Sequence, residues 1–232
     1  MIIRLFFVML GLSLSVCTAS ATVIIAEETW DTGFQGWSNQ TGFATSIANP
    51  GTGGNPDGYF RIDFDAQTPP PTPGENYDIV RTFSTPADSL FTGNYIENDV
   101  AAVRFDFFAE DTEAAFVGIY FGVSTNSNVW RYNGLVSPEV GTWTTLTAYF
   151  DFNAGWTRGP GSTEAQFLAD LQAVDWIGVY IRRSGINEQD YGIDNFQLFV
   201  PEPSEYAIMF CSLLLMGAVY AKSRQRSISA QG

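Results

Sequence analysis

VAAVRFDFF, at positions 100–108, shows more clearly than any other stretch how this chain folds. One set of alternate positions is wholly apolar and consists of Val103, Phe105 and Phe107. The other set includes the charged residues Arg104 and Asp106. Successive side chains on a β-strand point to opposite faces, so this pattern predicts a strand with one face in a core. The following segment, 114–123, is almost entirely apolar, which is typical of a strand inside a sheet or sandwich.

Several further segments are short, rich in β-branched and aromatic residues, and separated by Gly, Pro, Asn and Asp. Segments of this composition, separated by turn-forming residues, predict strands joined by turns. The predicted strands are 22–27, 58–65, 78–84, 128–132, 142–150, 174–182 and 191–199. Glu110–Glu113 is predicted to be a solvated hairpin turn between two core strands. The fold class expected from these patterns is all-β.

One segment departs from the period of two. Thr163 and Gln166 have the spacing of a capping box, in which each residue bonds to the backbone of the other. Phe167, Leu168 and Leu171 then recur at helical spacing. We expect one short helix here, lying over an end of the sheets.

The residues that the sequence lacks exclude several classes of function. The chain has no histidine, which excludes a Ser-His-Asp triad, a Cys-His pair and a histidine-ligated metal site. Its two cysteines, Cys17 and Cys211, lie in apolar terminal segments. The region between these segments therefore has no internal disulfide, and its stability must come from a hydrophobic core.

The region 22–199 is strongly acidic and contains no lysine. The whole chain has 25 acidic and 11 basic residues, and the terminal segments contribute Arg4, Glu202, Glu205, Lys222, Arg224 and Arg226. That leaves 23 acidic and seven basic residues, a net charge of −16. Such a field repels nucleic acid and anionic lipid and favours divalent cations or neutral ligands. Solubility alone is the alternative explanation for the acidity.

The N-terminus has the pattern of a secretory signal peptide. Arg4 is followed by an apolar run, 5–16, and by the small residues Ala19-Ser20-Ala21 at a cleavage position. Residues 1–21 are therefore predicted to be removed, leaving a mature chain that begins near Thr22. Cys17 suggests a lipoprotein as an alternative, but Val16 stands where a lipobox has a small residue.

The C-terminal segment has three elements in a fixed order. The first is Pro201-Glu202-Pro203, in which the two prolines cannot continue a β-ladder, and the second is an uncharged apolar run, 206–221. As a helix this run spans roughly 24 Å, somewhat less than the ~30 Å hydrocarbon core. A basic tail, 222–226, follows and predicts a cytoplasmic end. Its basic residues are Lys222, Arg224 and Arg226.

This ending resembles the PEP-CTERM sorting signal of Gram-negative bacteria. The resemblance covers 200–226 and implies recognition by exosortase, a membrane-embedded protease-transpeptidase, with cutting near the motif. It implies export across the inner membrane to the cell surface or the exopolysaccharide matrix, with a membrane span before processing. Residues 227–232 form an extension beyond the usual end of such a signal. The alternative is an ordinary membrane anchor, and both place the domain outside the cytoplasm.

The region 22–199 resembles the jelly-roll β-sandwiches of the galactose-binding-like and carbohydrate-binding-module class. The similar motifs are residues 30–37 (WDTGFQGW), 141–143 (GTW), 174–179 (VDWIGV) and 191–196 (YGIDNF). A jelly roll pairs its first and last strands, so the expected fold is a jelly-roll β-sandwich with one short helix. The resemblance also implies a structural calcium at Asp194, with Glu28, Asp31 or Asp190 as neighbours.

Sugar-binding modules stack aromatic rings on pyranose rings and bond the hydroxyls with polar side chains. The aromatic residues predicted to lie in loops or on outward positions are Trp130, Tyr132 and Trp156, with Arg131 and Arg158 beside them. A purely structural role at the rim is the alternative for these rings. The tryptophans predicted to belong to the core are Trp30, Trp37, Trp143 and Trp176.

Together these features predict a non-enzymatic surface or matrix protein that associates with extracellular polysaccharide. Its expected partners are exosortase, the polysaccharide and, through the C-terminal helix, the membrane for a time, but not nucleic acid. Catalytic residues are not predicted, because no Glu-x-Asp-x-Glu pattern is present on a strand. The alternatives are a structural or adhesive protein without sugar binding, and a carbohydrate-active enzyme.

Overall fold

The computed structural model describes residues 22–40, 44, 46–67, 77–82, 90–123 and 128–201. Residues 24–200 group into one structural unit. The predicted signal peptide, membrane helix, basic tail and extension all lie outside the described residues, as do Glu202 and Pro203. Within the described part of the chain, no helix has the length and apolar character needed to cross a membrane.

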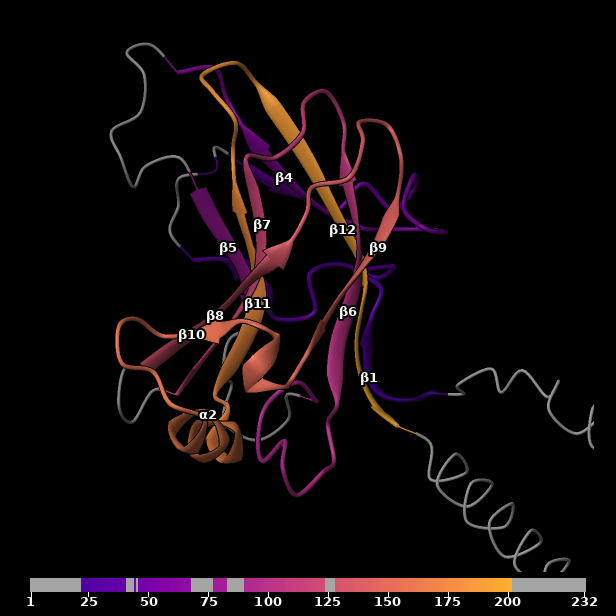
Figure 1. The fold of residues 1–232 in the computed structure, drawn as a ribbon. Helices are drawn as coiled ribbons and strands as arrows, with labels where there is room; N and C mark the ends of the chain where they lie inside the picture. The colour runs from indigo at the N-terminus through magenta and orange to yellow at the C-terminus, as the bar shows by residue number, and fades with distance from the viewer. Residues whose placement is uncertain are drawn as a thin grey trace, which may run out of the picture. The chain divides into compact units, whose positions relative to one another are not determined.

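The strands form two antiparallel sheets that pack as a sandwich (Figure 1). Sheet A has the order β3 (Ser46–Ala48), β4 (Phe60–Phe64), β12 (Gln189–Pro201), β6 (Ala102–Ala109) and β9 (Thr144–Tyr149), with β1 (Thr22–Glu28) also paired to β12. Sheet B has the order β10 (Trp156–Thr157), β8 (Asn128–Leu135), β7 (Phe116–Val123), β11 (Trp176–Arg182), β5 (Tyr77–Thr82) and β2 (Trp37–Asn39). The predicted all-β sandwich is confirmed.

The first and last strands pair, as a jelly roll requires: β1 lies against β12. β12 also pairs with β4 and with β6, so it organises most of sheet A. Its register with β6 shifts between Asp194 and Gln197, and Asn195 there has a positive φ of 49°. This bulge turns the local backbone and places Asn195 on the outer side of the sheet.

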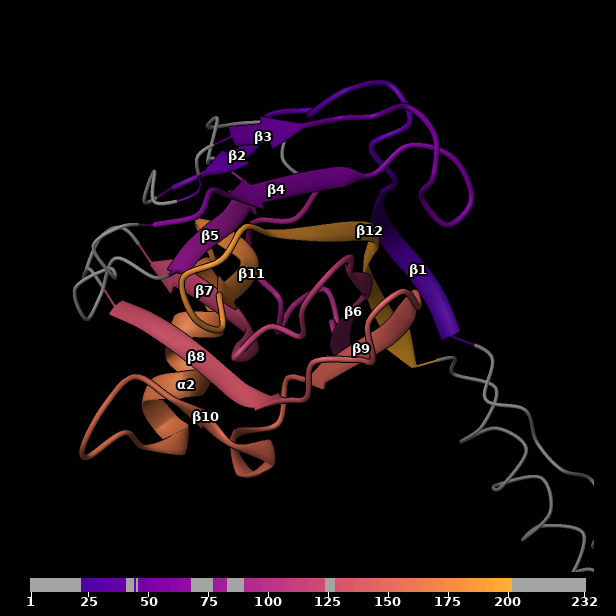
Figure 2. The ribbon, with the colours of Figure 1, turned by 90° about the horizontal axis from the view of Figure 1, so that it is seen from above.

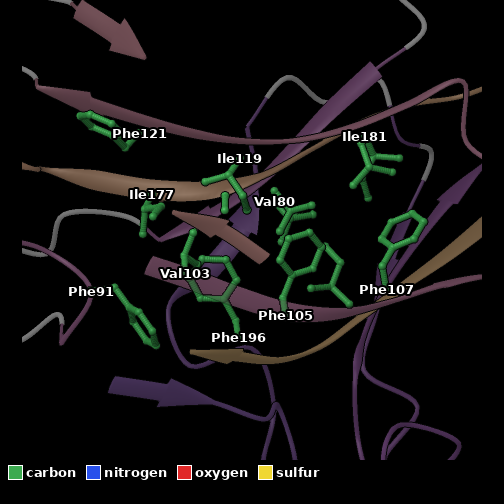
Figure 3. Packing of buried hydrophobic residues seen from close by; sticks show 14 of the residues in the cluster. Val80, Phe91, Val103, Phe105, Phe107, Ile119, Phe121, Ile177, Ile181 and Phe196 are labelled. Carbon is green, nitrogen blue, oxygen red and sulfur yellow. The ribbon is translucent and has the colours of Figure 1, made fainter. Parts of the chain in front are cut away.

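The core lies between the two sheets and follows the predicted alternation. Val103, Phe105 and Phe107 of β6 are fully buried. Figure 3 shows them opposite side chains of sheet B, including Ile119 and Phe121. Fully burying one such side chain stabilises a fold by about 1.5–3 kcal/mol. This aromatic core therefore replaces the missing disulfides as the source of stability.

The predicted capping box and helix are confirmed. The Thr163 hydroxyl accepts from the Gln166 backbone N–H, and the Gln166 side chain accepts from the Thr163 N–H. Helix α2 (Glu164–Asp170) follows, then a 3₁₀ turn (Leu171–Ala173). The helix lies beside β8 and β10 (Figures 1 and 2), where Phe167 packs edge-on against Trp130 at 5.0 Å. A second 3₁₀ turn, Phe152–Ala154, precedes β10.

The predicted hairpin at Glu110–Glu113 is wrong. β6 belongs to sheet A and β7 to sheet B, so the segment between them crosses from one sheet to the other. β6 pairs instead with β9 and β12. The charged side chains of the crossing remain largely exposed, which agrees with the predicted solvation.

Candidate functional site

The outer face of sheet B carries a second hydrophobic cluster that is separate from the core. Its members come from β5, β7, β8 and β11 and are Tyr77, Ile79, Tyr120, Val129, Trp176 and Tyr180. The alternate residues of the same strands, such as Ile119 and Val179, are fully buried in the core. The period of two therefore places the cluster on the side of the sheet that faces away from sheet A.

Glycines on neighbouring strands make room for these rings. Tyr120 pairs with Gly178, Tyr180 with Gly118, and Trp176 with Gly122. A Cβ atom on Gly122 would lie 2.1 Å from the Trp176 Nε1 atom. The Trp176 ring therefore covers Gly122, and any side chain at position 122 would clash with it.

Three tyrosines form a continuous stack across β5, β11 and β7. The Tyr180 ring lies 4.6 Å from the Tyr120 ring at 13°, and 4.9 Å from the Tyr77 ring at 27°. Phe116 meets the edge of Tyr180 at 5.5 Å. These contacts hold each ring in one orientation, so the aromatic surface is formed in advance of any ligand.

Charged and polar side chains border the stack. The Arg131 guanidinium lies 5.7 Å from the centre of the Tyr120 ring, and that of Arg81 lies 4.6 Å from the centre of the Trp176 ring. The stack and its border form an open pocket of about 300 Å³. The pocket is lined by Gln40, Tyr77, Ile79, Tyr120, Val129, Arg131, Trp176 and Tyr180. Its volume is at the lower end of the range for small-molecule sites, about 300–1,000 Å³.

The hydroxyls of Tyr120 and Tyr180 stay neutral. Burial raises the pKa of Tyr120 to about 12, with a further rise from Tyr180 that Arg131 opposes. Burial likewise raises the pKa of Tyr180. A neutral phenol both donates and accepts a hydrogen bond. The pocket thus combines the half-buried rings of Tyr77 and Tyr180 and the largely buried rings of Tyr120 and Trp176 with groups that bond uncharged hydroxyls.

Five residues were predicted to lie at a sugar site. Trp130, Tyr132, Trp156 and Arg158 lie together, but largely in the core at the α2 end of the sandwich. Arg131 is exposed and lines the pocket on sheet B instead. Trp130 and Trp156 are 0% and 3% exposed, so neither presents a ring face to solvent. The Trp130 Nε1 donates to Asp170, and the Trp156 Nε1 donates to the Tyr149 carbonyl. Tyr132 is half-buried against Trp156. Arg158 forms an ion pair with Asp170 at 3.1 Å. This network joins α2 to β8 and β10.

The pocket beside Tyr77, Tyr120 and Tyr180, called the tyrosine pocket below, was not predicted from the sequence. The sequence nevertheless contains a pattern that indicates it. On alternate positions β7 has Phe116, Gly118, Tyr120 and Gly122, and β11 has Trp176, Gly178, Tyr180 and Arg182. Alternating aromatic residues and glycines on paired strands indicate rings lying over an open backbone. Trp176 therefore belongs to the outer cluster, whereas Trp30 and Trp37 are in the core, as predicted.

Three of the predicted calcium ligands lie near one another. Burial raises the pKa of Asp194 to about 6, and the charges of Asp106 and Asp31 contribute to the rise. Burial also raises the pKa of Glu28, with contributions from Asp31 and Asp194. Within the described residues, none of these carboxylates forms an ion pair. This corner therefore concentrates negative charge that no basic side chain offsets.

The same carboxylates already accept backbone hydrogen bonds. Asp194 accepts from the N–H groups of Asn55 and Asn195, and Asp31 accepts from Gly58. In the described part of the chain no three carboxylates are gathered as the ligands of one metal ion. The residue types and charge suit calcium, but the present spacing of the carboxylates does not form a complete site.

Asp190, the fourth predicted ligand, lies elsewhere. Its carboxylate is bound by Arg61 at 2.6 Å, and Arg61 also contacts Asp63 at 2.6 Å and Glu110 at 3.7 Å. Burial raises the pKa of Asp190, with a further rise from Asp63 that Arg61 opposes. Asp190 therefore belongs to an ion-pair network on the outer face of sheet A.

The chain has a jelly-roll β-sandwich fold that is similar to the fold of solved carbohydrate-binding modules. It is similar to the family 11 module of the cellulosomal cellulase Lic26A-Cel5E of Clostridium thermocellum, with 16% identity, a TM-score of 0.50, and coverage of 80% of this chain and 97% of that one. A solution structure of CtCBM11 gives 16% identity, a TM-score of 0.51, and 81% and 99% coverage.

The C. thermocellum family 11 module in complex with a β-1,3-1,4-mixed-linked tetrasaccharide gives 16% identity, a TM-score of 0.50, and 77% and 98% coverage. At this level of identity the likeness establishes the fold. No protein-family model and no curated protein sequence matches the chain.

Proposed function

We propose that this is an exported, non-enzymatic surface or matrix protein that binds extracellular polysaccharide through the outer face of sheet B. The observation that carries the proposal is the stack of Tyr77, Tyr180 and Tyr120 beside Trp176. Aromatic rings that are held in one orientation provide an apolar surface for pyranose rings, and neutral phenols suit the sugar hydroxyls. The likeness to sugar-binding modules supports the same function.

The charge of the domain favours a neutral glycan. A net charge of −16 over 22–199 repels polyanions, and nucleic acid is therefore not a partner. The residues that line the pocket include no carboxylate, whereas glycoside hydrolysis uses a pair of them. Binding without catalysis is the function that this lining supports.

The PEP-CTERM resemblance supplies the route to the surface. β12 ends at Pro201, the first residue of the motif. Cutting by exosortase near Pro201-Glu202-Pro203 would therefore leave the strands of both sheets intact. The mature protein would lose the predicted membrane helix and basic tail, and would remain at the surface or in the matrix of a Gram-negative cell.

We also propose that a structural calcium lies in the corner formed by Glu28, Asp31 and Asp194. Calcium takes six to eight oxygen ligands, which backbone carbonyls and water complete. Its charge would favour the ionised forms of Glu28 and Asp194, whose pKa values are raised mainly by burial and further by neighbouring carboxylates. The ion would hold the segment after β1 against β12.

Affinity electrophoresis of residues 22–201 tests the binding site. The gels contain β-1,3-1,4-glucan, xylan or agarose, with alginate as an acidic comparison. We expect at least one neutral polysaccharide to retard the domain, and Tyr120→Ala and Arg131→Ala to weaken the retardation. Tyr132→Ala is the matched control, because it removes a tyrosine of the α2 network and leaves the pocket unchanged.

The outcomes separate the alternative functions. Equal retardation of Tyr120→Ala and wild type would place binding elsewhere and contradict the proposed site. Release of reducing sugar from any of the polysaccharides would favour an enzyme. Absence of retardation in every gel would favour a structural or adhesive protein.

A further inference from the structure

The outer face of sheet A contains a polar pocket that the proposed function does not use. Its volume is about 360 Å³, and it is lined by Arg104, Asp106, Thr145, Asn195 and Gln197. We infer that this pocket is a second binding site, for one segment of a neutral polyhydroxylated chain, and that it works independently of the tyrosine pocket.

The strand pattern explains why these residues share one face. Arg104 and Asp106 occupy the alternate positions of β6 that point away from the core residue Phe105. β9 pairs with β6 so that Thr145 lies opposite Asp106. The bulge in β12 adds Asn195 to the same face. Three neighbouring strands thus supply one pocket.

Hydrogen bonds fix the pocket around Asp106, which is only 6% exposed. Its carboxylate accepts from the Thr145 hydroxyl at 2.5 Å, from the Asn195 side chain at 2.8 Å and from the Asn55 side chain at 3.0 Å. At the other side the Arg104 Nε donates to Gln197. A buried carboxylate with several donors holds those side chains in one arrangement.

The pocket keeps unused hydrogen-bonding capacity. Within the described residues, the two terminal nitrogens of Arg104 form no hydrogen bond or ion pair. The Thr145 hydroxyl donates to Asp106 and retains lone pairs to accept with. The side-chain oxygen of Asn195 accepts no bond from the described part of the chain. Donors and acceptors therefore stand side by side, as the hydroxyl groups of a sugar require.

Aromatic side chains extend this face along β6 and β9. Trp143 stacks on Phe108 at 5.1 Å and 29°, two residues beyond Thr145 and Asp106. Trp143 was predicted to belong to the core, but it lies on this face, half-buried, with Tyr59 at its edge. At the other end of β9, Tyr149 is 57% exposed. The seven residues from Trp143 to Tyr149 span about 20 Å, the length of an extended chain of several sugars.

The charges of the pocket indicate the class of ligand. One arginine and one aspartate line it, and its other lining residues are uncharged. The strongly acidic domain would repel a polyanion, and the positive charge of Arg104 would repel a small cation. An uncharged chain with many hydroxyls is repelled by neither charge.

A second site changes what one domain can do. The two pockets lie on the outer faces of opposite sheets, so two polysaccharide chains can bind without meeting. Each domain would then bridge two chains and cross-link a matrix, and the avidity of the network would exceed the affinity of either site. This consequence for the matrix rests on the proposed function, whereas the pocket on sheet A stands on its own geometry.

Isothermal titration of residues 22–201 with tetrasaccharides of β-1,3-1,4-glucan, xylan and agarose tests the inference. Residues 24–200 form one structural unit with its own core, so this segment is suitable for the measurement. We expect two sites per domain. Thr145→Val and Arg104→Gln should each remove one site, and Tyr120→Ala the other. Thr144→Val is the matched control, since Thr144 adjoins Thr145 but lies on the opposite face of β9 and does not line the pocket.

Each possible result supports or overturns the second site, the proposed function, or both. One site in the wild type, lost in Tyr120→Ala and kept in Thr145→Val and Arg104→Gln, would overturn the inference and leave the proposed function intact. One site lost only in Thr145→Val and Arg104→Gln would support the inference and contradict the proposed pocket. Heat from none of the three tetrasaccharides would overturn both. Thermal melting confirms that every variant is folded, and the near-isosteric Thr145→Val protects the test if Arg104→Gln unfolds.

Discussion

The acidic corner at Glu28, Asp31 and Asp194 predicts how pH and calcium affect the stability of the domain. Without calcium the domain should be more stable at lower pH, whereas calcium should stabilise it more at higher pH. The pKa of Asp194 is about 6 in the folded domain, mainly because of burial, against about 3.9 in an unfolded chain. The folded state therefore binds the proton more tightly. The stabilisation is fully present below about pH 4 and is lost as the pH rises through about 6.

The size of the effect follows from the two pKa values. Between pH 7.5 and 5.0 the linkage relation gives about 1.4 kcal/mol for Asp194, which solvent screening reduces to about 1 kcal/mol. For a domain of this size the expected rise in melting temperature is about 2–4 °C. Glu28 acts in the same direction, because its pKa is also raised.

Calcium should act most strongly at the higher pH, where the carboxylates are ionised. At a hundredfold excess over its Kd, a ligand that binds only the folded state stabilises it by about 2.7 kcal/mol. We therefore expect calcium to raise the melting temperature at pH 7.5 more than at pH 5.0. The assay is thermal unfolding of residues 22–201 at both values, in EDTA and in calcium, with magnesium as the comparison.

Two variants locate the effect. Asp194→Asn should abolish the calcium-dependent rise, because it removes a charge from the corner. Asp190→Asn should keep it, because Asp190 pairs with Arg61 elsewhere on sheet A. A melting temperature that is the same in EDTA and calcium at pH 7.5 would refute the calcium site. A domain without calcium that is less stable at pH 5.0 than at pH 7.5 would refute the reasoning on Asp194.

Three further predictions follow from the structure. Tyr180→Ala should lower the free energy of unfolding by about 2–4 kcal/mol, measured in urea, because three ring contacts disappear. The same change should weaken polysaccharide binding about tenfold in a titration. Unchanged binding would contradict the role of the stack. Asp170→Ala should cost about 3–5 kcal/mol in urea unfolding, because Arg158 and the Trp130 Nε1 lose their acceptor, and a loss below about 1 kcal/mol would show that this network is unimportant. Mass spectrometry of the mature surface protein should find a C-terminus near Pro201-Glu202-Pro203; a protein that still carries 222–232 would instead have a permanent anchor.

The fold could be predicted because its strands repeat one simple rule. Val103, Phe105 and Phe107 alternate with Arg104 and Asp106, so their inward and outward faces are distinguishable by polarity alone. The capping box at Thr163 is likewise a local pattern with a local cause. Glu110–Glu113 was predicted to be a hairpin turn, but it crosses between the sheets. A charged turn has the same sequence pattern whether the strands that it joins belong to one sheet or to two.

The binding face could not be found by the same rule. On β7 both sets of alternate positions are apolar, so polarity does not show that Tyr120 faces outward and Phe121 inward. Conversely, Trp130 lies among polar residues in the sequence but is buried, because α2 and Asp170 cover it. Which aromatic residues reach the surface depends on elements that are distant in the sequence.

The central claim is that the tyrosine stack on sheet B binds a neutral polysaccharide. Backbone amide shifts of residues 22–201 during titration with a β-1,3-1,4-glucan, xylan or agarose tetrasaccharide test it most directly. Saturable shifts should appear on β5, β7 and β11 around Tyr77, Tyr120 and Tyr180. Shifts confined to the α2 end around Trp130, Tyr132 and Trp156, or no shifts with any of the three tetrasaccharides, would contradict the account.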